Sequence, residues 1–375
     1  MKIAVNTRLL LTNKLDGIGR FTNELMFRIV AAHPECEFHF LFDRPFDPEF
    51  VRYGNIVPHV VRPPLRHSLL GWIWFDWSVR RKLKKIEPDV FFSPDSMNLL
   101  SPVCKNVTVI HDLNFVHFPE HLNFFLRLYY QKRVPIVARN ATALVSVSDF
   151  SAKDISEHYG VDASSIHVIS NAVGKEFVPV SQREKEETRK KLTGGKEYFI
   201  HVGTLYQRKN LLNQIKAFEK FKESSKSEMK FLIAGNMVKD ACELIEYTNR
   251  SRYKEDVIFS GRISEEQLPA ALSAANALVY VSVFEGFGMP ILEALNCGTP
   301  VLTSKTSSMP EVAGDAALYA DPHNIEEIAG AMYDLSSNEE LRSTLLSHAA
   351  KQVAKFDWDR SAEQLWEVLS AAAKK

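Results

Sequence analysis

The chain has 375 residues, a length that suits two domains and excludes a single small binding module or a disulfide-stapled mini-protein. Its 46 Lys and Arg residues balance 46 Asp and Glu residues, so the formal net charge is zero and no overall field attracts nucleic acid or an anionic membrane. With 45% hydrophobic and 25% charged residues, the composition is that of a globular protein with a large core.

The cysteines and the N-terminus indicate the compartment. Cys36, Cys104, Cys242 and Cys297 lie far apart and form neither a C-x-x-C pair nor a zinc-binding spacing, so we expect buried thiols in a reducing environment. The N-terminal apolar run is too short for a signal peptide, and no stretch approaches the roughly 18 apolar residues of a membrane span. The sequence therefore predicts a cytoplasmic protein that is either soluble or attached to a membrane surface.

Short β-branched and aromatic runs alternate with helical segments along the whole chain, which is the pattern of parallel βαβ units. In the first half, strands are predicted at Lys2–Thr7, Glu37–Phe42, Val90–Ser93, Val107–Ile110, Ala143–Ser146 and Ile166–Ile169. In the second half they are predicted at Tyr198–Val202, Lys230–Ala234, Val257–Ser260, Ala277–Tyr280, Pro300–Thr303 and Ala317–Ala320. These two sets predict an α/β protein with two Rossmann-like, doubly wound domains.

The segment Leu69–Lys85 places aromatic residues next to basic ones. Trp72 and Trp74 precede Arg80 and Arg81, and a second aromatic and basic helix is predicted at His121–Arg133. Such a composition is typical of a helix on a membrane surface. It is also typical of an ordinary helix with its aromatic side chains in the core and its cations in water, so both interpretations stay open.

The join between the domains is expected near Val178–Arg183, just before the charged helix Gln182–Lys191. We therefore expect a first domain over residues 1–178 and a second over residues 179–357. The chain ends in an amphipathic helix, residues 358–375, in which Leu365, Trp366 and Leu369 share one face and need an apolar surface to cover.

A candidate anion site follows the predicted strand Tyr198–Val202. Gly203 ends that strand, Arg208 and Lys209 follow, and Asn210 is a candidate N-cap of the next predicted helix. A glycine turn, two adjacent cations and a helix N-terminus together favour binding of a phosphate or diphosphate. The alternative is a solvated loop with two ordinary cations.

The segment from Val283 to Ala294 carries the richest pattern. Pro290 suits the start of a helix, so Gly286 and Gly288 are expected in a tight turn at the carboxyl end of the strand Ala277–Tyr280. Glu285 in the loop and Glu293 in the first helical turn would then lie on one side, where carboxylates accept hydrogen bonds from sugar hydroxyls. Alternatively, Glu293 only complements the helix dipole and Glu285 is a surface acid.

The run E-G-F-G-x-P-x-x-E-A, which contains Glu285 and Glu293, closely resembles the signature of glycosyltransferase family 4, retaining enzymes of the GT-B fold. The resemblance covers nearly the whole chain, because the Arg208-Lys209 loop, the turn Phe259–Ile263 and the segment Met309–Gly314 follow in the family's order. It implies two Rossmann-like domains facing a central cleft, with the last helix packed back on the first domain.

The resemblance also implies roles for individual residues. The implied catalytic residues are His111, Arg208, Lys209 and Glu285. Donor-binding roles are implied for Gly17, Gly19, Gly203, Arg208, Lys209, Ile263, Glu285, Gly286, Phe287, Gly288, Met289 and Glu293. In these roles Glu293 holds the ribose and Glu285 the transferred sugar, while the loop around Gly17 and Gly19 departs from the family's usual double glycine.

A departing nucleoside diphosphate gains negative charge, which Arg208, Lys209 and helix N-termini would stabilise. No Asp-x-Asp motif stands between a strand and a helix, so we expect neither a metal nor a cofactor. The chain looks most like bacterial mannosyltransferases of polysaccharide assembly. This implies transfer of a hexose, first mannose from GDP-mannose and second a UDP-sugar, to a glycan or lipid-linked glycan at the cytoplasmic face of the inner membrane.

Two other classes of protein fit the same architecture. A sugar-nucleotide epimerase or glycoside phosphorylase would share the donor residues but not the acceptor. A non-catalytic partner that binds a sugar nucleotide would keep the affinity and lack the transfer.

Overall fold

The computed structural model describes residues 1–12, 15–65, 68–122, 124–238 and 241–375. The chain forms two compact units, one of Met1–Asn171 with Asp357–Lys375 and the other of Ala172–Phe356. The sequence places the join after Val178, whereas the contacts place it after Asn171. The intervening segment packs with the second unit, where the Asn296 side chain donates a hydrogen bond to the carbonyl of Phe177 (2.7 Å).

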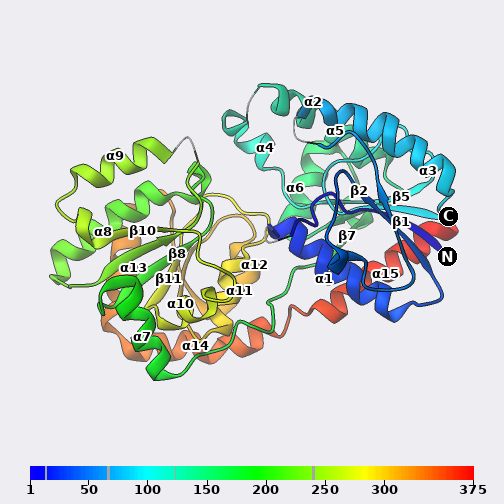
Figure 1. The fold of residues 1–375 in the computed structure, drawn as a ribbon. Coiled ribbons are helices and arrows are strands. Elements are labelled where there is room, and N and C mark those ends of the chain that lie inside the picture. Colours follow the sequence, from blue (N-terminus) through cyan, green and yellow to red (C-terminus); the bar gives the residue numbers. More distant parts are fainter. Residues whose placement is uncertain (13–14, 66–67, 123, 239–240) are drawn as a thin grey trace. The chain divides into compact units, whose positions relative to one another are not determined.

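The first unit is built on a seven-stranded parallel sheet with the strand order β3-β2-β1-β4-β5-β6-β7 (Figure 1). Its strands are β1 (Lys2–Asn6), β2 (Glu37–Phe42), β3 (Ile56–Val60), β4 (Val90–Ser93), β5 (Lys105–Ile110), β6 (Ala143–Ser146) and β7 (Ile166–Val168). Its helices are α1 (Gly17–Ala32), α2 (Ser68–Ile73), α3 (Arg80–Ile86), α4 (Asn114–His117), α5 (Phe124–Asn140), α6 (Asp149–Tyr159) and α15 (Trp358–Lys374). A π-helical turn, η2 (Trp74–Val79), joins α2 to α3.

The second unit is a six-stranded parallel sheet with the order β10-β9-β8-β11-β12-β13. Its strands are β8 (Tyr198–Val202), β9 (Lys230–Ala234), β10 (Val257–Gly261), β11 (Ala277–Tyr280), β12 (Val301–Ser304) and β13 (Ala317–Ala320). Its helices are α7 (Gln182–Thr193), α8 (Leu211–Ser225), α9 (Cys242–Arg250), α10 (Leu268–Ala274), α11 (Met289–Asn296), α12 (Met309–Ala313), α13 (Ile325–Ser337) and α14 (Glu339–Val353). Both strand orders are Rossmann-like, so the predicted fold class is confirmed for each unit.

The last helix belongs to the first unit, where α15 lies along α1 (Figure 1). Leu365 and Leu369 are fully buried, and the ring of Trp358 meets the ring of Phe21 edge-on at 6.4 Å between centroids. The hydroxyl of Ser361 donates a hydrogen bond to the carbonyl of Ser170 (2.9 Å). The apolar face of this helix therefore covers part of the first unit's core.

The aromatic segment of the first unit divides between core and surface. Trp74 is completely buried, and its indole nitrogen donates a hydrogen bond to the carbonyl of Val61 (2.7 Å). Of the two interpretations left open for this segment, the core interpretation is therefore confirmed for Trp74 and the membrane-facing one is wrong for it. Trp72, Ile73 and Trp77 are 44%, 48% and 68% exposed instead.

The second predicted aromatic helix, His121–Arg133, also differs from the structure. The α-helix observed there is α5, which begins at Phe124 and runs on to Asn140. Asn123, within the predicted range, lies outside the described residues. In the described part of the chain, no helix has the length and apolar character needed to cross a membrane.

The cysteines are less uniform than predicted. Cys36 and Cys297 are buried and Cys104 is half-buried, but Cys242 is exposed at the start of α9. The prediction of a buried thiol is therefore wrong for Cys242, which begins an amphipathic helix on its solvent side.

Candidate functional site

The centre of the second sheet is a topological switch point. Strands β8 and β11 lie side by side there, although the chain leaves them towards opposite edges of the sheet. In open parallel sheets the loops at the carboxyl ends of two such strands diverge and leave room for a ligand. The loop after β8 carries Arg208 and Lys209, and the loop after β11 carries Glu285, so residues far apart in the sequence meet at this point.

These three side chains form one ion-pair group, which we call the Glu285 cluster. The carboxylate of Glu285 lies 2.8 Å from Nη1 of Arg208 through Oε2 and 2.7 Å from Nζ of Lys209 through Oε1. Glu285 and Lys209 are only 5% and 7% exposed. The three residues, which the family resemblance assigns to one site, are therefore in contact within the second unit.

The Glu285 cluster carries an excess of positive charge. Burial on its own would raise the pKa of Glu285, but the charges of Arg208 and then Lys209 outweigh burial and lower this pKa to about 2. The carboxylate is thus ionised at neutral pH. Two cations share one carboxylate, so the cluster offers a site for an anionic group.

Short backbone and side-chain contacts fix the two cations. Gly203 has φ +147°, and a Cβ atom there would come within 3.4 Å of Cε of Lys209. The ammonium of Lys209 also donates a hydrogen bond to the hydroxyl of Tyr280 (2.5 Å) at the end of β11. The guanidinium of Arg208 donates to the carbonyl of Phe284 (2.9 Å), so the loops after β8 and β11 are tied together.

Asn210 plays a different part from the predicted one. It adopts a left-handed conformation (φ +61°) before α8, and its side chain does not cap that helix. The side-chain amide instead donates hydrogen bonds to the carbonyls of Val281 (3.1 Å) and Pro322 (2.6 Å). Asn210 therefore occupies the predicted N-cap position of α8, but its side chain joins three loops at the carboxyl edge of the sheet instead of capping the helix.

Two serines, Ser307 and Ser308, hold the loop that contains Glu285. The hydroxyl of Ser308 donates to the carbonyls of Glu285 (2.9 Å) and Phe287 (2.8 Å), and the amide of Glu285 donates to the hydroxyl of Ser307 (3.0 Å). Gly288 then turns the chain with φ +110° into α11, which begins at Met289. Gly286 and Phe287 are buried within this turn.

Glu293 is the fifth residue of α11 and lies just past its first turn, one residue further along than predicted, because the helix already begins at Met289. It is 6% exposed. Burial is the main cause that raises the pKa of Tyr280, and the charges of Glu285 and Glu293 add to it, so both carboxylates lie near this hydroxyl. Ile263 is half-buried after β10, an edge strand that β9 separates from β8.

The remaining predicted residues, Gly17, Gly19 and His111, belong to the first unit. The amide of Gly19 donates a hydrogen bond to the carboxylate of Asp16 (2.8 Å), which caps α1. A Cβ atom at Gly19 would approach the carbonyl oxygen of Leu9 to 2.7 Å, whereas one at Gly17 would meet nothing within 4 Å. Gly19 therefore serves a close backbone approach, and its amide is committed to the cap.

His111 follows β5, and its Nε2 lies 2.8 Å from the carbonyl oxygen of Pro94. Because a carbonyl only accepts, Nε2 carries the proton. Burial lowers the pKa of His111, so the imidazole is neutral at pH 7. A neutral ring held in one tautomer presents its Nδ1 as an acceptor.

The sequence did not reveal a second ion pair at the switch point of the first sheet, where β1 and β4 are neighbours. There the guanidinium of Arg8 pairs with the carboxylate of Asp95, and the side-chain amide of Asn6 donates to the hydroxyl of Ser93 (3.0 Å). Burial opposes the charge on Arg8, but Asp95 outweighs it and the pKa is raised. The one available signal is that Arg8 and Asp95 each follow a predicted strand closely.

Comparison with known families matches both parts of the chain. The family described as Glycosyltransferase Family 4 matches residues 15–177, and the family described as Glycosyl transferases group 1 matches residues 182–352. The chain is 26% identical over 365 residues to O-antigen chain mannosyltransferase B of Escherichia coli, covering 93% of this chain and 94% of that protein. It is 27% identical to O-antigen chain mannosyltransferase RfbU of Salmonella typhimurium, covering 82% and 81%.

Solved structures share the fold at lower identity. The HepE protein of Anabaena, in complex with UDP and glucose, is 18% identical with a TM-score of 0.74, and the alignment covers 99% of both chains. WaaG, a glycosyltransferase involved in lipopolysaccharide biosynthesis, is 16% identical with a TM-score of 0.76 over 98% of this chain and 99% of that one.

Proposed function

We propose that this chain, which belongs to the glycosyltransferases of family 4, transfers mannose from GDP-mannose to a glycan or lipid-linked glycan. It has the two Rossmann-like domains of the GT-B fold and is a hexosyltransferase. The resemblance to two O-antigen mannosyltransferases supports mannose as the sugar. A UDP-sugar is the second candidate donor, because a structural neighbour holds UDP and glucose.

The observation that carries this proposal is the net positive Glu285 cluster at the switch point of the second sheet. Arg208 and Lys209 neutralise the charge that grows on the diphosphate as the bond to the sugar breaks. Glu285 accepts hydrogen bonds from the transferred sugar, and Glu293 accepts them from the ribose. Gly203, Ile263 and the turn from Gly286 to Met289 complete the donor contacts.

The transfer retains the configuration at the anomeric carbon. The acceptor hydroxyl attacks this carbon on the face from which the diphosphate departs, a new C–O bond forms as the old one breaks, and the leaving phosphate oxygen takes the hydroxyl proton. His111 takes part in this step, and the loop of Gly17 and Gly19 approaches the donor through the exposed Gly17. Because two side-chain cations stabilise the leaving group, the reaction needs neither a divalent metal nor a cofactor.

A binding screen followed by a transfer assay tests the proposal. GDP, UDP, ADP and dTDP are compared by thermal shift, and a ligand at about 100 times its dissociation constant adds about 2.7 kcal/mol to the free energy of unfolding. We expect GDP to give the largest shift and GDP-[14C]mannose with EDTA to label a lipid-linked glycan. A larger shift with UDP selects the second donor.

Three outcomes contradict the proposal. If no nucleoside diphosphate raises the melting temperature, the Glu285 cluster is not a donor site. If a nucleoside diphosphate binds but no sugar reaches any acceptor, the chain is a non-catalytic sugar-nucleotide-binding partner. Conversion of the sugar nucleotide without an acceptor indicates an epimerase.

We propose further that the protein works in the cytoplasm and touches the inner membrane through the first unit. Six exposed apolar side chains lie on α2, η2 and α5, and we call them the aromatic patch. They are Trp72, Ile73, Trp77, Phe124, Phe125 and Leu128. Exposed cations on α3 and α5 accompany them, namely Arg81, Lys84, Lys85, Arg127 and Lys132. Apolar side chains combined with cations favour an anionic lipid surface, where a lipid-linked acceptor resides.

A further inference from the structure

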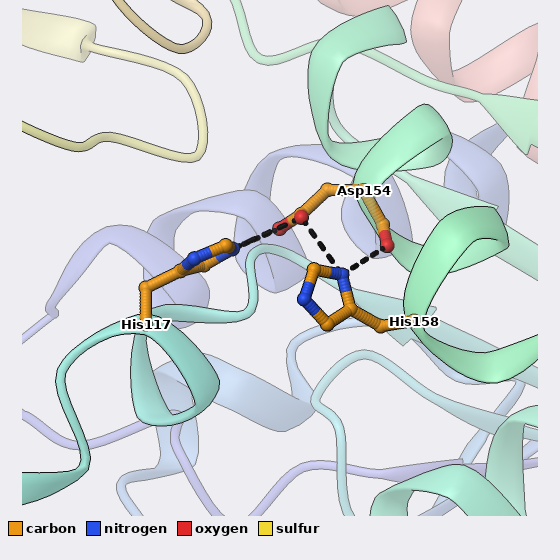
Figure 2. A group of neighbouring side chains, drawn as sticks. All are labelled: His117, Asp154 and His158. Carbon is orange, nitrogen blue, oxygen red and sulfur yellow. Dashed lines mark hydrogen bonds and ion pairs between the residues drawn. The ribbon is translucent and has the colours of Figure 1, made fainter.

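Two histidines contact one carboxylate in the first unit, and none of the three residues has a role in the proposed function (Figure 2). Nε2 of His117 lies 2.9 Å from each carboxylate oxygen of Asp154. Nδ1 of His158 lies 3.1 Å from Oδ1 of the same carboxylate. One donor atom from each residue lies within 4.8 Å of the others, so the three side chains converge on a single point.

The local fold explains this convergence. Asp154 and His158 are four residues apart on α6 and therefore share one face of that helix. His117 is the last residue of α4, and Figure 2 shows its ring reaching the carboxylate beside the ring of His158, with 5.1 Å between the ring centroids. Asp154 is 6% exposed, whereas the side chains of His117 and His158 are 31% and 35% exposed.

We propose that His117, Asp154 and His158 bind a zinc ion. Two imidazoles and one carboxylate form a donor set suited to Zn²⁺, whereas Mg²⁺ and Ca²⁺ prefer oxygen ligands alone. Bonds of roughly 2.0–2.2 Å in a tetrahedron place neighbouring donor atoms about 3.4 Å apart. The ring nitrogens of His117 and His158 lie 2.9 and 3.1 Å from the carboxylate of Asp154, and a slight outward movement of the two partly exposed rings lengthens these distances to that value. Water then fills the fourth position.

Zinc would replace the direct contacts of these rings. Both imidazoles must present an unprotonated nitrogen to the ion, so Nε2 of His117 and Nδ1 of His158 give up the protons they share with Asp154. His158 also gives up the contact between its Nδ1 and the carbonyl oxygen of Asp154 (3.0 Å).

The bound ion would fasten α4 to α6. Helix α4 begins shortly after His111, so the ion would limit the movement of the chain that follows this proposed active-site residue. The Glu285 cluster belongs to the other unit. The ion is thus a structural clip of the first unit, and the proposed metal-independent transfer does not require it.

Titration of the full chain with zinc alone tests the proposal. After EDTA treatment and removal of the chelator, calorimetry should show one Zn²⁺ bound per chain and a higher melting temperature. Co²⁺ should give the visible absorption of a tetrahedral site with nitrogen ligands. His117→Gln and His158→Gln should each weaken zinc binding at least about tenfold, because each removes one of only three protein ligands.

The matched control is His323→Gln, which changes an exposed histidine of the second unit and should leave the zinc affinity unchanged. Both ligand variants lie at partly exposed positions, and circular dichroism checks that they fold. Absence of stoichiometric zinc binding overturns the proposal, and so does binding that His117→Gln and His158→Gln do not affect. In either case the three residues form a hydrogen-bonded clip without an ion.

Discussion

Glu285 holds both cations of the proposed donor site, since Arg208 and Lys209 both pair with its carboxylate. We expect Arg208→Ala and Glu285→Ala each to lower kcat about 10²–10³-fold, the effect of removing one charged group that stabilises or positions the reacting atoms. Steady-state kinetics at saturating donor measure this. Arg250→Ala, which breaks an exposed ion pair with Glu246, serves as the control and should retain normal turnover.

Stability must be measured beside activity for these variants. Removing one partner of a buried ion pair leaves the other charge unpaired, which costs about 3–5 kcal/mol. Glu285→Gln keeps the shape of the side chain and is the gentler variant. Near-normal turnover in folded Arg208→Ala and Glu285→Ala would exclude the proposed roles.

At this scale, the groups that a known family's motifs contain were predicted, whereas a pair outside those motifs was not. The family resemblance placed Glu285 and the Arg208-Lys209 pair in one site, and the structure shows them in contact. Arg8 and Asp95 also follow neighbouring strands, yet nothing in a single sequence indicates that these two side chains pair. Their contact depends on the strand order, which places β1 beside β4.

Among the elements, the strands of both sheets were largely predictable, because buried parallel strands form continuous apolar runs. The exception is β3, which contains Pro58 and lies at the edge of its sheet. Proline cannot donate a ladder hydrogen bond and is found mainly at edges, strand starts and bulges, so Pro58 disfavours the prediction of a strand.

Which side chains of the aromatic segment Leu69–Lys85 are buried was not predictable, for a different reason. The π-helical turn η2 adds about one residue to a helical turn and rotates the residues that follow it. A periodicity of 3.6 residues therefore misassigns this segment. Trp74 and Phe75 enter the core, while Trp77 reaches the surface.

The aromatic patch gives a prediction for membrane binding. Trp72→Ala combined with Trp77→Ala and Phe124→Ala should lower the affinity for vesicles of anionic phospholipid at least about tenfold, because these side chains lose their apolar contact with the acyl region. Cosedimentation measures the bound fraction. Tyr333→Ala removes a 45% exposed aromatic ring of the second unit and should change nothing.

The melting temperature of the triple variant separates lipid binding from folding. Its three positions are exposed, so we expect the melting temperature to stay within a few degrees of the parent's. Trp74→Ala is unsuitable for this test, since it would open a cavity in the core. Unchanged vesicle binding by the folded triple variant would rule out the aromatic patch as the membrane contact.

The whole molecule should lose stability in mild acid through its buried histidines. Burial, followed by the nearby charge of Lys209, lowers the pKa of His201 to about 4, so this ring is neutral in the folded protein at pH 7. The unfolded chain binds a proton near pH 6.5. The stabilisation from keeping His201 neutral is therefore fully present above about pH 6.5 and is lost as the pH falls towards 4.

Urea unfolding at pH 7, 6 and 5 measures this effect. His201→Gln should reduce the slope of unfolding free energy against pH by up to about 1.4 kcal/mol per pH unit, the contribution of one proton. His59, whose pKa burial lowers to about 4, maintains part of the slope in the variant. An unchanged slope would show that His201 does not titrate differently in the folded and unfolded states.

The packing of α15 on α1 also affects how the chain folds during its synthesis on the ribosome. The first unit is assembled from both ends of the polypeptide, whereas the second is one uninterrupted stretch. Synthesis thus delivers every residue of the second unit before the helix that completes the first. Until α15 emerges, Phe21 and its neighbours on α1 lack their cover, so α1 reaches its final packing only after the second unit has been made.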